Sequence, residues 1–351
     1  MPRKLCLPAG VGDIGLRLLN DWQRDFPLES RPFARIAAAV GMAESDVIDA
    51  YGELRTKGVV SRIGAVFAPR RLGASALAAM AVPPSRLEAV AARVSAEAAI
   101  NHNYQREHRY NLWFVVTASS AERLQQVVAG LERDTGCAVI VLPLEEEFHI
   151  DLGFDLREPA GEGACNSPAG RRRERASIVL DGDAACALPA IERELVTALQ
   201  GGLALEARPF ESLGKKVGLS EAMTLEFIAR WVCEGLIRRF GVVVRHHELG
   251  MEANAMCVWD VPEQDVSALG RSLAREHAVT LCYRRRRALP DWPYNLFCMI
   301  HGSAREDVLA ARADLAQRLG LDAYPSATLF SCRRFKQTGA HYLSPGALAH
   351  A

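Results

Sequence analysis

The chain contains two copies of one sequence pattern, and this internal repeat limits the folds open to its 351 residues. The segment RPFARIAAAVG, which begins at Arg31, aligns with RPFESLGKKVG from Arg208, and the same offset aligns VSRIGAVF with IRRFGVVV. Further along, YNLWF at Tyr110 matches YNLFC at Tyr294. Repetition over this length predicts two homologous halves, each with its own set of helices and strands.

Each half is predicted to begin with short helices and to continue as alternating strands and helices. In the first half, the apolar periodicity predicts strands over 63–68, 74–82, 100–106, 110–118 and 138–149, with helices over 85–98 and 121–134. Three short helices followed by a strand are typical of a winged helix-turn-helix, and the later order predicts a ferredoxin-like sheet. We therefore expect an α+β fold, a tandem repeat of a winged helix-turn-helix plus a ferredoxin-like (βαββαβ) domain, which resembles the Lrp/AsnC regulator architecture.

The two halves are joined by a segment without apolar periodicity. The stretch EPAGEGACNSPAGRRRER is rich in Gly, Ala, Pro and charge, which is typical of a linker, and its arginine run is typical of a solvated tether. The expected domains are 12–62 and 188–239 for the helix-turn-helix units, 63–156 and 240–345 for the ferredoxin-like units, and 157–177 for the linker.

Composition excludes several classes of protein. The chain has 42 Lys plus Arg and 42 Asp plus Glu, so no net field draws it toward nucleic acid or an anionic membrane. Its nine cysteines are scattered without CxxC pairs, no apolar run reaches the length of a membrane span, and the start MPRKLCLPAG lacks an export segment. We expect a cytoplasmic protein that has reduced thiols and no membrane partner.

The two candidate recognition helices argue against DNA binding. ESDVIDAYGELRTKG and SEAMTLEFIARWVCEG each carry more acidic than basic residues, whereas a recognition helix presents cationic or amide side chains to phosphates and base edges. We expect these helices to be retained for packing. An unusual recognition mode is the alternative.

The segment NHNYQREHRYNLWF concentrates polar and aromatic side chains in the first half. On a strand, His102, Tyr104 and Arg106 lie on one face. In a ferredoxin-like sheet, the strand that ends LEEEFHIDLGF can bring His149 close to His102. A lone histidine in a strand is usually structural, but a polar row in a strand expected to be half apolar favours a site. Tyr110 is a candidate for the same site or for core packing.

The second half replaces these imidazoles with positive charge. Tyr283 matches Tyr104 and Arg285 matches Arg106, but Leu281 replaces His102 and Lys336 replaces His149. Four consecutive arginines, 284–287, divide between the two faces of a strand, so either one pair faces the sheet cavity or the run is a solvated hairpin. Together the halves suit a single composite site for a large polyanion, with proton chemistry by histidines. The candidate catalytic residues are His102 and His149, and the candidate substrate-binding residues are Tyr104, Arg106, Tyr110, Tyr283, Arg284, Arg285, Arg286, Arg287 and Lys336.

These motifs resemble the sirohaem decarboxylases. The similarity rests on HNYQREHRYNLWF (102–114) and FHIDLGF (148–154) in the first half, and on YRRRR (283–287), YNLF (294–297) and RRFKQTG (333–339) in the second. The chain looks like the fused two-unit form associated with haem d1 biosynthesis. The resemblance implies a carboxy-lyase that converts two acetate side chains of sirohaem to methyl groups, giving didecarboxysirohaem. It implies no cofactor beyond the iron of the substrate.

The resemblance also implies roles and partners. His102 and His149 are expected to act as general acid and charge stabiliser, with either one also a candidate axial ligand of the substrate iron. Arg106, Arg285 and the neighbouring arginines are expected to hold carboxylates, and Tyr104 to hydrogen-bond an acetate. Expected partners are sirohaem, homologous decarboxylase subunits and, within the chain, an internal pseudo-dimer, with a homo-oligomer also open. The alternatives are an Lrp/AsnC-type regulator with a small effector and a non-catalytic haem-binding protein.

Overall fold

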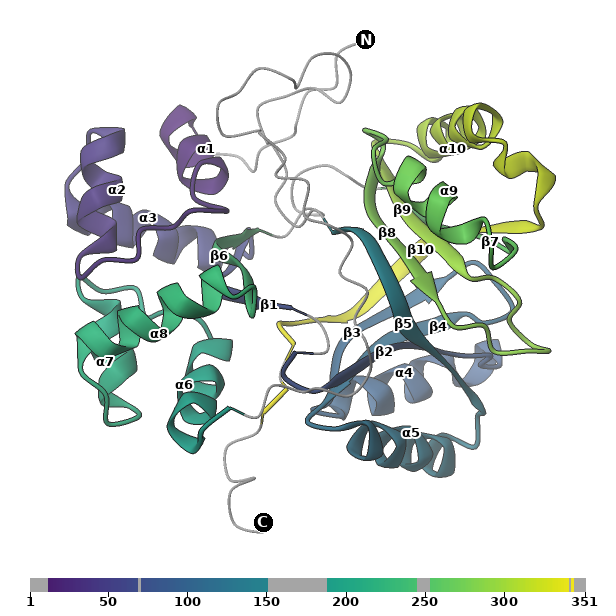
Figure 1. Ribbon diagram of the computed structural model, residues 1–351, viewed down its shortest axis with the longest axis horizontal. Coiled ribbons are helices and arrows are strands. Elements are labelled where there is room, and N and C mark those ends of the chain that lie inside the picture. Colours follow the sequence, from purple (N-terminus) through teal and green to yellow (C-terminus); the bar gives the residue numbers. More distant parts are fainter. Residues whose placement is uncertain (1–11, 69–70, 151–187, 245–252, 341, 344–351) are drawn as a thin grey trace.

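The protein consists of a helical unit and an eight-stranded barrel that lie side by side, with a two-stranded ribbon between them (Figure 1). The computed structural model describes residues 12–68, 71–150, 188–244, 253–340 and 342–343. The expected linker, 157–177, lies outside the described residues. Both halves of the chain contribute to the helical unit, the ribbon and the barrel, so the tandem α+β repeat is confirmed.

The two halves present the same order of elements, as the repeat predicts. None of the helices in the described ranges is long and apolar enough to cross a membrane. The elements are α1 (Asp13–Asn20), α2 (Pro32–Val40), α3 (Glu44–Thr56), β1 (Val60–Phe67), β2 (Ala74–Met80), η1 (Pro84–Arg86), α4 (Leu87–Ala96), β3 (Ile100–Arg106), β4 (Leu112–Ala118), α5 (Ala121–Thr135) and β5 (Val139–Ile150), then α6 (Ala190–Gln200), α7 (Pro209–Lys215), α8 (Glu221–Cys233), β6 (Ile237–Val244), β7 (Ala253–Trp259), α9 (Val266–Leu273), β8 (Val279–Arg285), β9 (Leu296–Gly302), α10 (Arg305–Leu319), η4 (Leu321–Ala323) and β10 (Ser326–Gln337).

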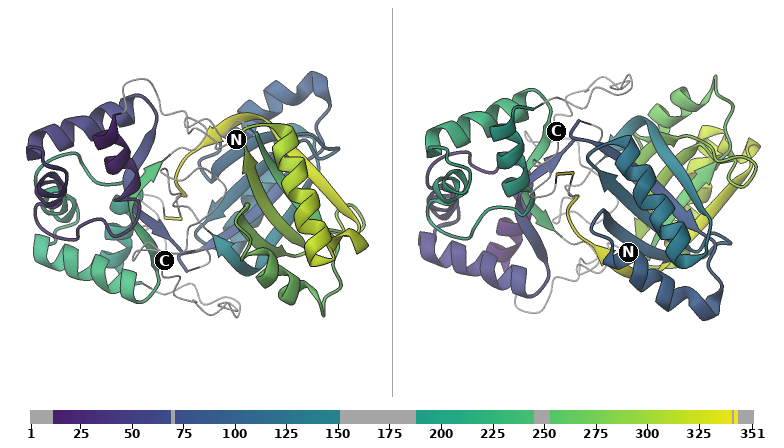
Figure 2. Two further views of the ribbon diagram at one scale, coloured as in Figure 1. Left: turned by 90° about the horizontal axis from the view of Figure 1, so that it is seen from above. Right: turned by 90° about the horizontal axis from the view of Figure 1, so that it is seen from below.

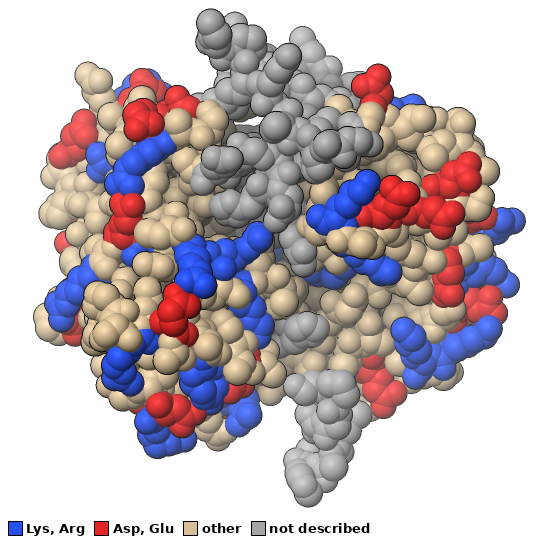
Figure 3. All heavy atoms as spheres, turned by 180° about the vertical axis from the view of Figure 1, so that it is seen from behind, with Lys and Arg blue, Asp and Glu red and all other residues tan. Residues whose placement is uncertain are grey.

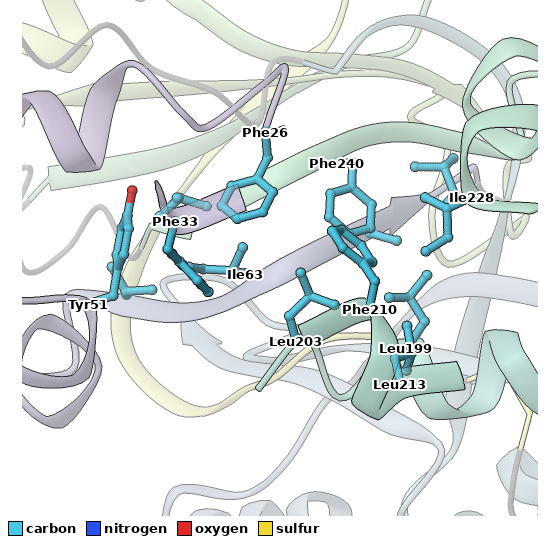
Figure 4. Packing of buried hydrophobic residues seen from close by; sticks show 14 of the residues in the cluster. Phe26, Phe33, Tyr51, Ile63, Leu199, Leu203, Phe210, Leu213, Ile228 and Phe240 are labelled. Atoms are coloured by element: carbon cyan, nitrogen blue, oxygen red, sulfur yellow. The ribbon is translucent and has the colours of Figure 1, made fainter. Parts of the chain in front are cut away.

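The helical unit is one hydrophobic core shared by both helix-turn-helix segments. Phe33 and Tyr51 of the first half and Phe210 and Phe240 of the second are buried in the same cluster (Figure 4). Local signals in the sequence set the helix ends: α2 starts with proline and ends at Gly41 in the left-handed conformation (φ 75°), where a side chain would be strained. The two helix-turn-helix segments therefore form one pseudo-dimeric unit.

The ribbon consists of β1 and β6, which pair antiparallel with Gly64 opposite Gly241. These glycines are equivalent in the repeat, so the pseudo-two-fold axis passes between them. A Cβ on Gly241 would lie 2.3 Å from the backbone oxygen of Gln23, so no side chain fits there. The expected boundary at 62/63 falls inside β1, whose residues pack in the helical core, and the ferredoxin-like sheet begins only at β2.

The barrel forms because each half supplies a four-stranded sheet whose edges pair with the other half. The strand order is β3-β4-β2-β5 in the first sheet and β8-β9-β7-β10 in the second, which is the predicted ferredoxin-like order in both. β5 pairs with β8, and β10 pairs with β3, so the two sheets close on each other. Sequence reasoning predicted the sheets but not their closure into one barrel.

Helices cover the outside of the barrel, and aromatic side chains fill its far end. α4 and α5 lie on the first sheet, and α9 and α10 lie on the second (Figure 2). Inside, a third cluster contains Trp113, Trp292 and Phe297, with Trp113 and Trp292 ring centroids 4.9 Å apart. This cluster closes one end of the barrel, and the end that faces the ribbon is left for polar side chains.

The segment after β10 ties the barrel to the helical unit. The backbone N–H of Thr338 donates to the carbonyl oxygen of Asn101 on β3 (2.8 Å). Beyond it, the N–H of Tyr342 donates to the side-chain oxygen of Gln200 on α6 (2.7 Å), and the Tyr342 ring is buried in the helical core. The chain therefore passes from the barrel wall into the other body within a few residues.

The close approach at Gly241 predicts a large effect of a single methyl group. Gly241→Ala should lower the free energy of unfolding by about 2 kcal/mol, because backbone atoms must shift to admit the Cβ. Gly52→Ala on α3 is the matched control: nothing lies within 4 Å of its Cβ, and alanine favours a helix by up to ~1 kcal/mol. Thermal unfolding of both variants checks this, and an unchanged midpoint for Gly241→Ala would contradict the packing described.

Candidate functional site

A cavity of about 440 Å³ lies between the open end of the barrel and the ribbon. Both halves line it. The ribbon contributes Arg62 and Arg239, and the barrel contributes Arg106 and Arg285, so four guanidinium groups approach one space. No aspartate or glutamate occurs among the described residues that line it. The cavity has the size of a small-molecule site and a strongly positive wall.

The alternation of β3 places the predicted polar row in the cavity. His102, Tyr104 and Arg106 all line it, whereas the side chain of Asn103 points outward and donates to the carbonyl oxygen of Ala91 (3.1 Å) on α4. A bulge between Ile100 and His102 in the pairing with β4 also turns Asn101 toward the cavity. The strand-face prediction for these three side chains therefore agrees with the structure.

Arg106 and Arg285 are buried at equivalent positions of the two halves. Arg106 donates to the carbonyl oxygen of Leu329 and Arg285 to that of Leu142, each at 3.0 Å. Each guanidinium also lies over a tyrosine ring, Arg106 over Tyr104 at 5.8 Å and Arg285 over Tyr283 at 5.0 Å. Burial lowers the pKa of each guanidinium to about 10, so both stay charged at neutral pH, and neither forms an ion pair with another described residue.

The ribbon adds Arg62 and Arg239 to the positively charged wall of the cavity. Arg62 donates to the carbonyl oxygen of Ala65 (3.1 Å), and burial lowers the pKa of its guanidinium. Its Nε is buried without a partner among the described residues. Gly339 packs directly on this side chain, since a Cβ there would lie 2.8 Å from Arg62 Nη1. Arg62 and Arg239 were visible as a matched pair in the repeat but were not predicted as site residues.

His102 is held as a neutral imidazole with a defined tautomer. Burial, with the charge of Arg62 as a second cause, lowers the pKa of His102 to about 4. Its Nδ1 lies 3.1 Å from the side-chain oxygen of Asn101, which only accepts, so Nδ1 carries the hydrogen and Nε2 carries the lone pair. The ring stacks on Tyr104 with centroids 6.2 Å apart. At neutral pH, His102 is therefore a base.

A second imidazole, His301, lines the cavity from the other half. It lies on β9, and its Nδ1 is 3.0 Å from the Thr280 hydroxyl. The equivalent position in the first half is Thr117, whose hydroxyl accepts from Asn101 (3.3 Å). Sequence reasoning missed His301. The available signal was a polar residue in the otherwise apolar strand LFCMIHG, at a position that is also polar in the first half.

The structure does not bring His149 to His102 by the expected route. β3 and β5 lie at opposite edges of the first sheet, with β4 and β2 between them, and His149 is in register with Cys282 of the second half. His149 is not among the described residues that line the cavity. The expected closeness of the two strands within the first sheet is not found, because the ferredoxin-like order itself places β3 and β5 at opposite edges.

Five of the predicted substrate-binding residues lie away from the cavity lining. Lys336 donates to the carbonyl oxygens of Ser95 and Glu97 at the end of α4 (2.8 and 3.0 Å), so it caps a helix. Tyr110 is buried in the aromatic cluster, with its ring 6.2 Å from that of Trp292. The remaining three are arginines that form ion pairs outside the barrel: Arg284 with Glu145 and Glu263, Arg286 with Glu145, and Arg287 with Asp260 and Glu263.

Strand geometry explains why Arg285 is separated from its three neighbours. Of the four arginines, Arg285 faces the cavity together with Tyr283, two positions earlier. β8 ends at Arg285, and a turn follows, so Arg287 does not continue the inward face. Both alternatives for the arginine run hold in part: one member is in the cavity, and the rest lie on the surface. In the described part of the chain, no cluster of three or more metal-ligating side chains occurs.

Two protein-family models each match the chain twice. The model described as "AsnC-like ligand binding domain" matches residues 71–149 and 248–336. The model described as "Siroheme decarboxylase NirDL-like HTH domain" matches residues 16–60 and 192–238. A curated relative from Paracoccus denitrificans, "Siroheme decarboxylase NirDL subunit", is 43% identical over 330 residues, covering 94% of this chain and 97% of the relative. The chain belongs to the siroheme decarboxylase NirDL family.

Other members of the family include shorter subunits and a solved complex. The "Siroheme decarboxylase NirD subunit" of Pseudomonas aeruginosa is 46% identical over 146 residues, which are 42% of this chain and 97% of that subunit. The crystal structure of a siroheme decarboxylase NirDL "in co-complex with iron-uroporphyrin III analogue" superposes with a TM-score of 0.66 at 29% identity, covering 95% of this chain and 94% of that one. The family therefore contains fused chains and single units.

The lowered pKa of His102 predicts a pH dependence of stability. The unfolded chain protonates this imidazole near its ordinary pKa of 6.5, whereas the folded chain does so only near 4. Below pH 6.5 the unfolded state therefore binds more protons, and the folded protein loses stability as the pH falls. Replacing His102 with Gln should remove about 2 kcal/mol of the difference in unfolding free energy between pH 7 and pH 4.5. Urea titrations at the two pH values check this, and equal differences in variant and wild type would contradict it.

Proposed function

We propose that the chain is a carboxy-lyase that removes carbon dioxide from two acetate side chains of sirohaem, leaving methyl groups, in haem d1 biosynthesis. The observation that carries the proposal is the set of four cavity arginines without a lining carboxylate. Arg106 is buried and Arg285 is half-buried, and burying a guanidinium is costly unless an anion neutralises it. Sirohaem supplies eight carboxylates around a flat ring, and family membership supports the assignment.

The pseudo-symmetry of the cavity suits a flat, ring-shaped polyanion. Arg62 and Arg239 approach from the ribbon, and Arg106 and Arg285 approach from opposite walls of the barrel. A guanidinium presents paired N–H donors that match a carboxylate, so charges placed on several sides can fix a macrocycle whose acids surround its rim. Trp113 and Phe297, which also line the cavity, provide apolar surface for the ring itself.

The proposed chemistry needs one proton delivered to carbon. When the bond from the methylene carbon to the carboxylate breaks, its electron pair passes into the conjugated ring, and a proton must then reach the methylene carbon to give a methyl group. Burial, together with the charge of Arg62, lowers the pKa of His102 and keeps its imidazole neutral at neutral pH. Substrate carboxylates bring negative charge and raise the pKa of this imidazole, so that it takes up the proton that it later donates.

His301 replaces His149 as the second imidazole of this proposal, because His301 lines the cavity. Thr280 positions its ring. The proposal assigns no cofactor beyond the iron that the substrate carries. The lone pair on His102 Nε2 also fits a role as axial ligand of the substrate iron. The two roles differ in the effect of removing the imidazole: loss of a proton donor lowers turnover, whereas loss of a ligand changes the visible spectrum.

A regulator function has less support. Glu44 of α3 is paired with Arg31, and Glu221 of α8 is paired with Arg208 (2.6 Å), so acidic side chains stand at the start of both candidate recognition helices. Positive and negative side chains are interspersed over the face in Figure 3, without a continuous basic patch there. We also propose that the protein acts in the cytoplasm. Homo-oligomers and separate homologous subunits stay predicted partners.

One pair of adjacent arginines tests the substrate-binding proposal. Arg285→Met should weaken sirohaem binding about 10- to 100-fold, because a buried guanidinium that meets carboxylates is lost. Arg286→Met is the matched control, since that side chain is 69% exposed and pairs with Glu145. Spectroscopic titration with sirohaem under anaerobic conditions, followed by mass analysis for loss of carbon dioxide, measures binding and turnover. Equal affinities of the two variants, or no mass change with the wild type, would refute the proposal.

One substitution distinguishes a proton-donor role of His102 from a role as ligand of the substrate iron. For a proton donor, His102→Ala should lower kcat by about 100-fold or more and leave the visible spectrum of bound sirohaem unchanged. A ligand role would instead change the spectrum. His108→Ala is the control within the same segment, because His108 stacks on Tyr110 in the turn after β3 and is not among the described lining residues. Full turnover by His102→Ala would exclude the proton-donor role, and an unchanged spectrum would exclude the ligand role.

A further inference from the structure

Within the barrel the two halves meet along two strand pairs, β5–β8 and β10–β3, and charge is divided unequally across the contacts, or seams, between the halves. Six ion pairs between described residues place the acid in the first half and the arginine in the second, whereas Arg109–Asp291, which is largely exposed, has the opposite polarity (3.9 Å). The six pairs are Glu145–Arg284 (3.0 Å), Glu145–Arg286 (3.6 Å), Glu146–Arg271 (3.5 Å), Glu107–Arg305 (2.7 Å), Glu147–Arg238 and Glu88–Arg333.

Three consecutive glutamates of β5 carry most of this asymmetry. Glu146 is buried and also accepts from the hydroxyl of Ser267 on α9 (2.5 Å). Glu147 binds both terminal nitrogens of Arg238, which joins β5 to the ribbon strand β6. The Glu147 and Arg238 side chains are 16% and 22% exposed, so solvent and salt screen this attraction less than they screen an exposed pair.

The second half carries the opposite charge at the equivalent positions. Glu147 is in register with Tyr283, and Arg334 is in register with Tyr104, so the repeat superposes Glu147 on Arg334. The same alignment superposes the block EEEF, ending at Phe148, on CRRF, ending at Phe335. Both phenylalanines pack against the partner half, so the two blocks serve the same seam contact with inverted charge.

This charge inversion determines which side chains would face each other if two copies of the same half formed a pair. In a pair of first halves, Glu146 would take the place of Arg333 and face Glu88. In a pair of second halves, Arg334 would take the place of Glu147 and face Arg238, and Arg333 would lie beside Arg271. At half-buried contacts, repulsion between like charges disfavours the wrong pairing by more free energy than attraction between opposite charges favours the correct pairing.

We infer that the charges of the seams form a pairing code. The surface formed by β5 and α4 of the first half fits a unit that carries the basic set of the second half, and it rejects a second copy of the first half. The correct occupant is therefore a second-half unit, whether it is supplied by the same chain or by another. In a chain with two nearly equivalent sheets, the code prevents like halves of different molecules from closing barrels with each other.

Two charge-reversed full-length chains test the code. The basic chain carries Glu145→Arg and Glu147→Arg, and the acidic chain carries Arg238→Glu and Arg284→Glu. Each chain alone opposes like charges, so its thermal unfolding midpoint should fall by about 5 °C or more. When the two are co-expressed with different tags, they should co-purify in equal amounts and recover the midpoint, because each first half now matches the second half of the other chain. This readout does not depend on sirohaem turnover.

A third variant and a control make the outcome decisive. One chain with all four substitutions restores opposite charges at the Glu145–Arg284 and Glu147–Arg238 contacts, so it should be more stable than either two-substitution chain and should not pair with them. Its midpoint stays below that of the wild type, because Glu263 and Arg286 keep their charges. Arg318→Glu reverses an exposed charge whose partners among the described residues, Glu276 and Asp314, lie in the second half, and it should leave pairing unchanged. The code would be overturned if the two-substitution chains were as stable as the wild type. It would equally be overturned if the four-substitution chain were no more stable than the two-substitution chains, or if co-expression gave no mixed complex.

Discussion

The pairing of strand edges between the halves is the interaction on which the rest of the structure depends. Each ferredoxin-like sheet alone leaves two edges with unpaired backbone groups, and unpaired edges are prone to wrong association. Closing β5 on β8 and β10 on β3 satisfies all four edges at once. The closed barrel also creates the interior that holds the cavity. Neither half contains this interior by itself.

Closure also determines where the buried charges are held. Arg106 of the first half is anchored by a carbonyl of β10, and Arg285 of the second half is anchored by a carbonyl of β5. Arg106 and Arg285 therefore each depend on the opposite half for their orientation. Burial disfavours these charges and lowers the pKa of both guanidinium groups. An anionic ligand removes this unfavourable term, so ligand binding and stability are coupled through the same side chains.

The sequence predicted the features that depend on local periodicity. The repeat, the strand limits within a few residues, and the common face of His102, Tyr104 and Arg106 all follow from alternation and helix ends, and the structure agrees with each of them. The features that it did not predict depend on contacts between distant segments. The position of His149 depends on which strand pairs with β5, and the separation of Arg285 from Arg284 and Arg286 depends on where β8 ends. Arg62, Arg239 and His301 become neighbours only when the ribbon and the second sheet are placed over the first.

The pseudo-two-fold axis through Gly64 and Gly241 relates walls that are similar in shape but different in chemistry. His102 faces the cavity where the other wall has Leu281, and His301 does so where the first wall has Thr117. A ligand turned by half a revolution would find its charged groups equally well matched by arginine, yet it would meet different reactive side chains. The near-symmetric arginine positions thus give tight binding. The few residues that differ across the axis give regioselectivity, which is the choice of the substrate side chains that react.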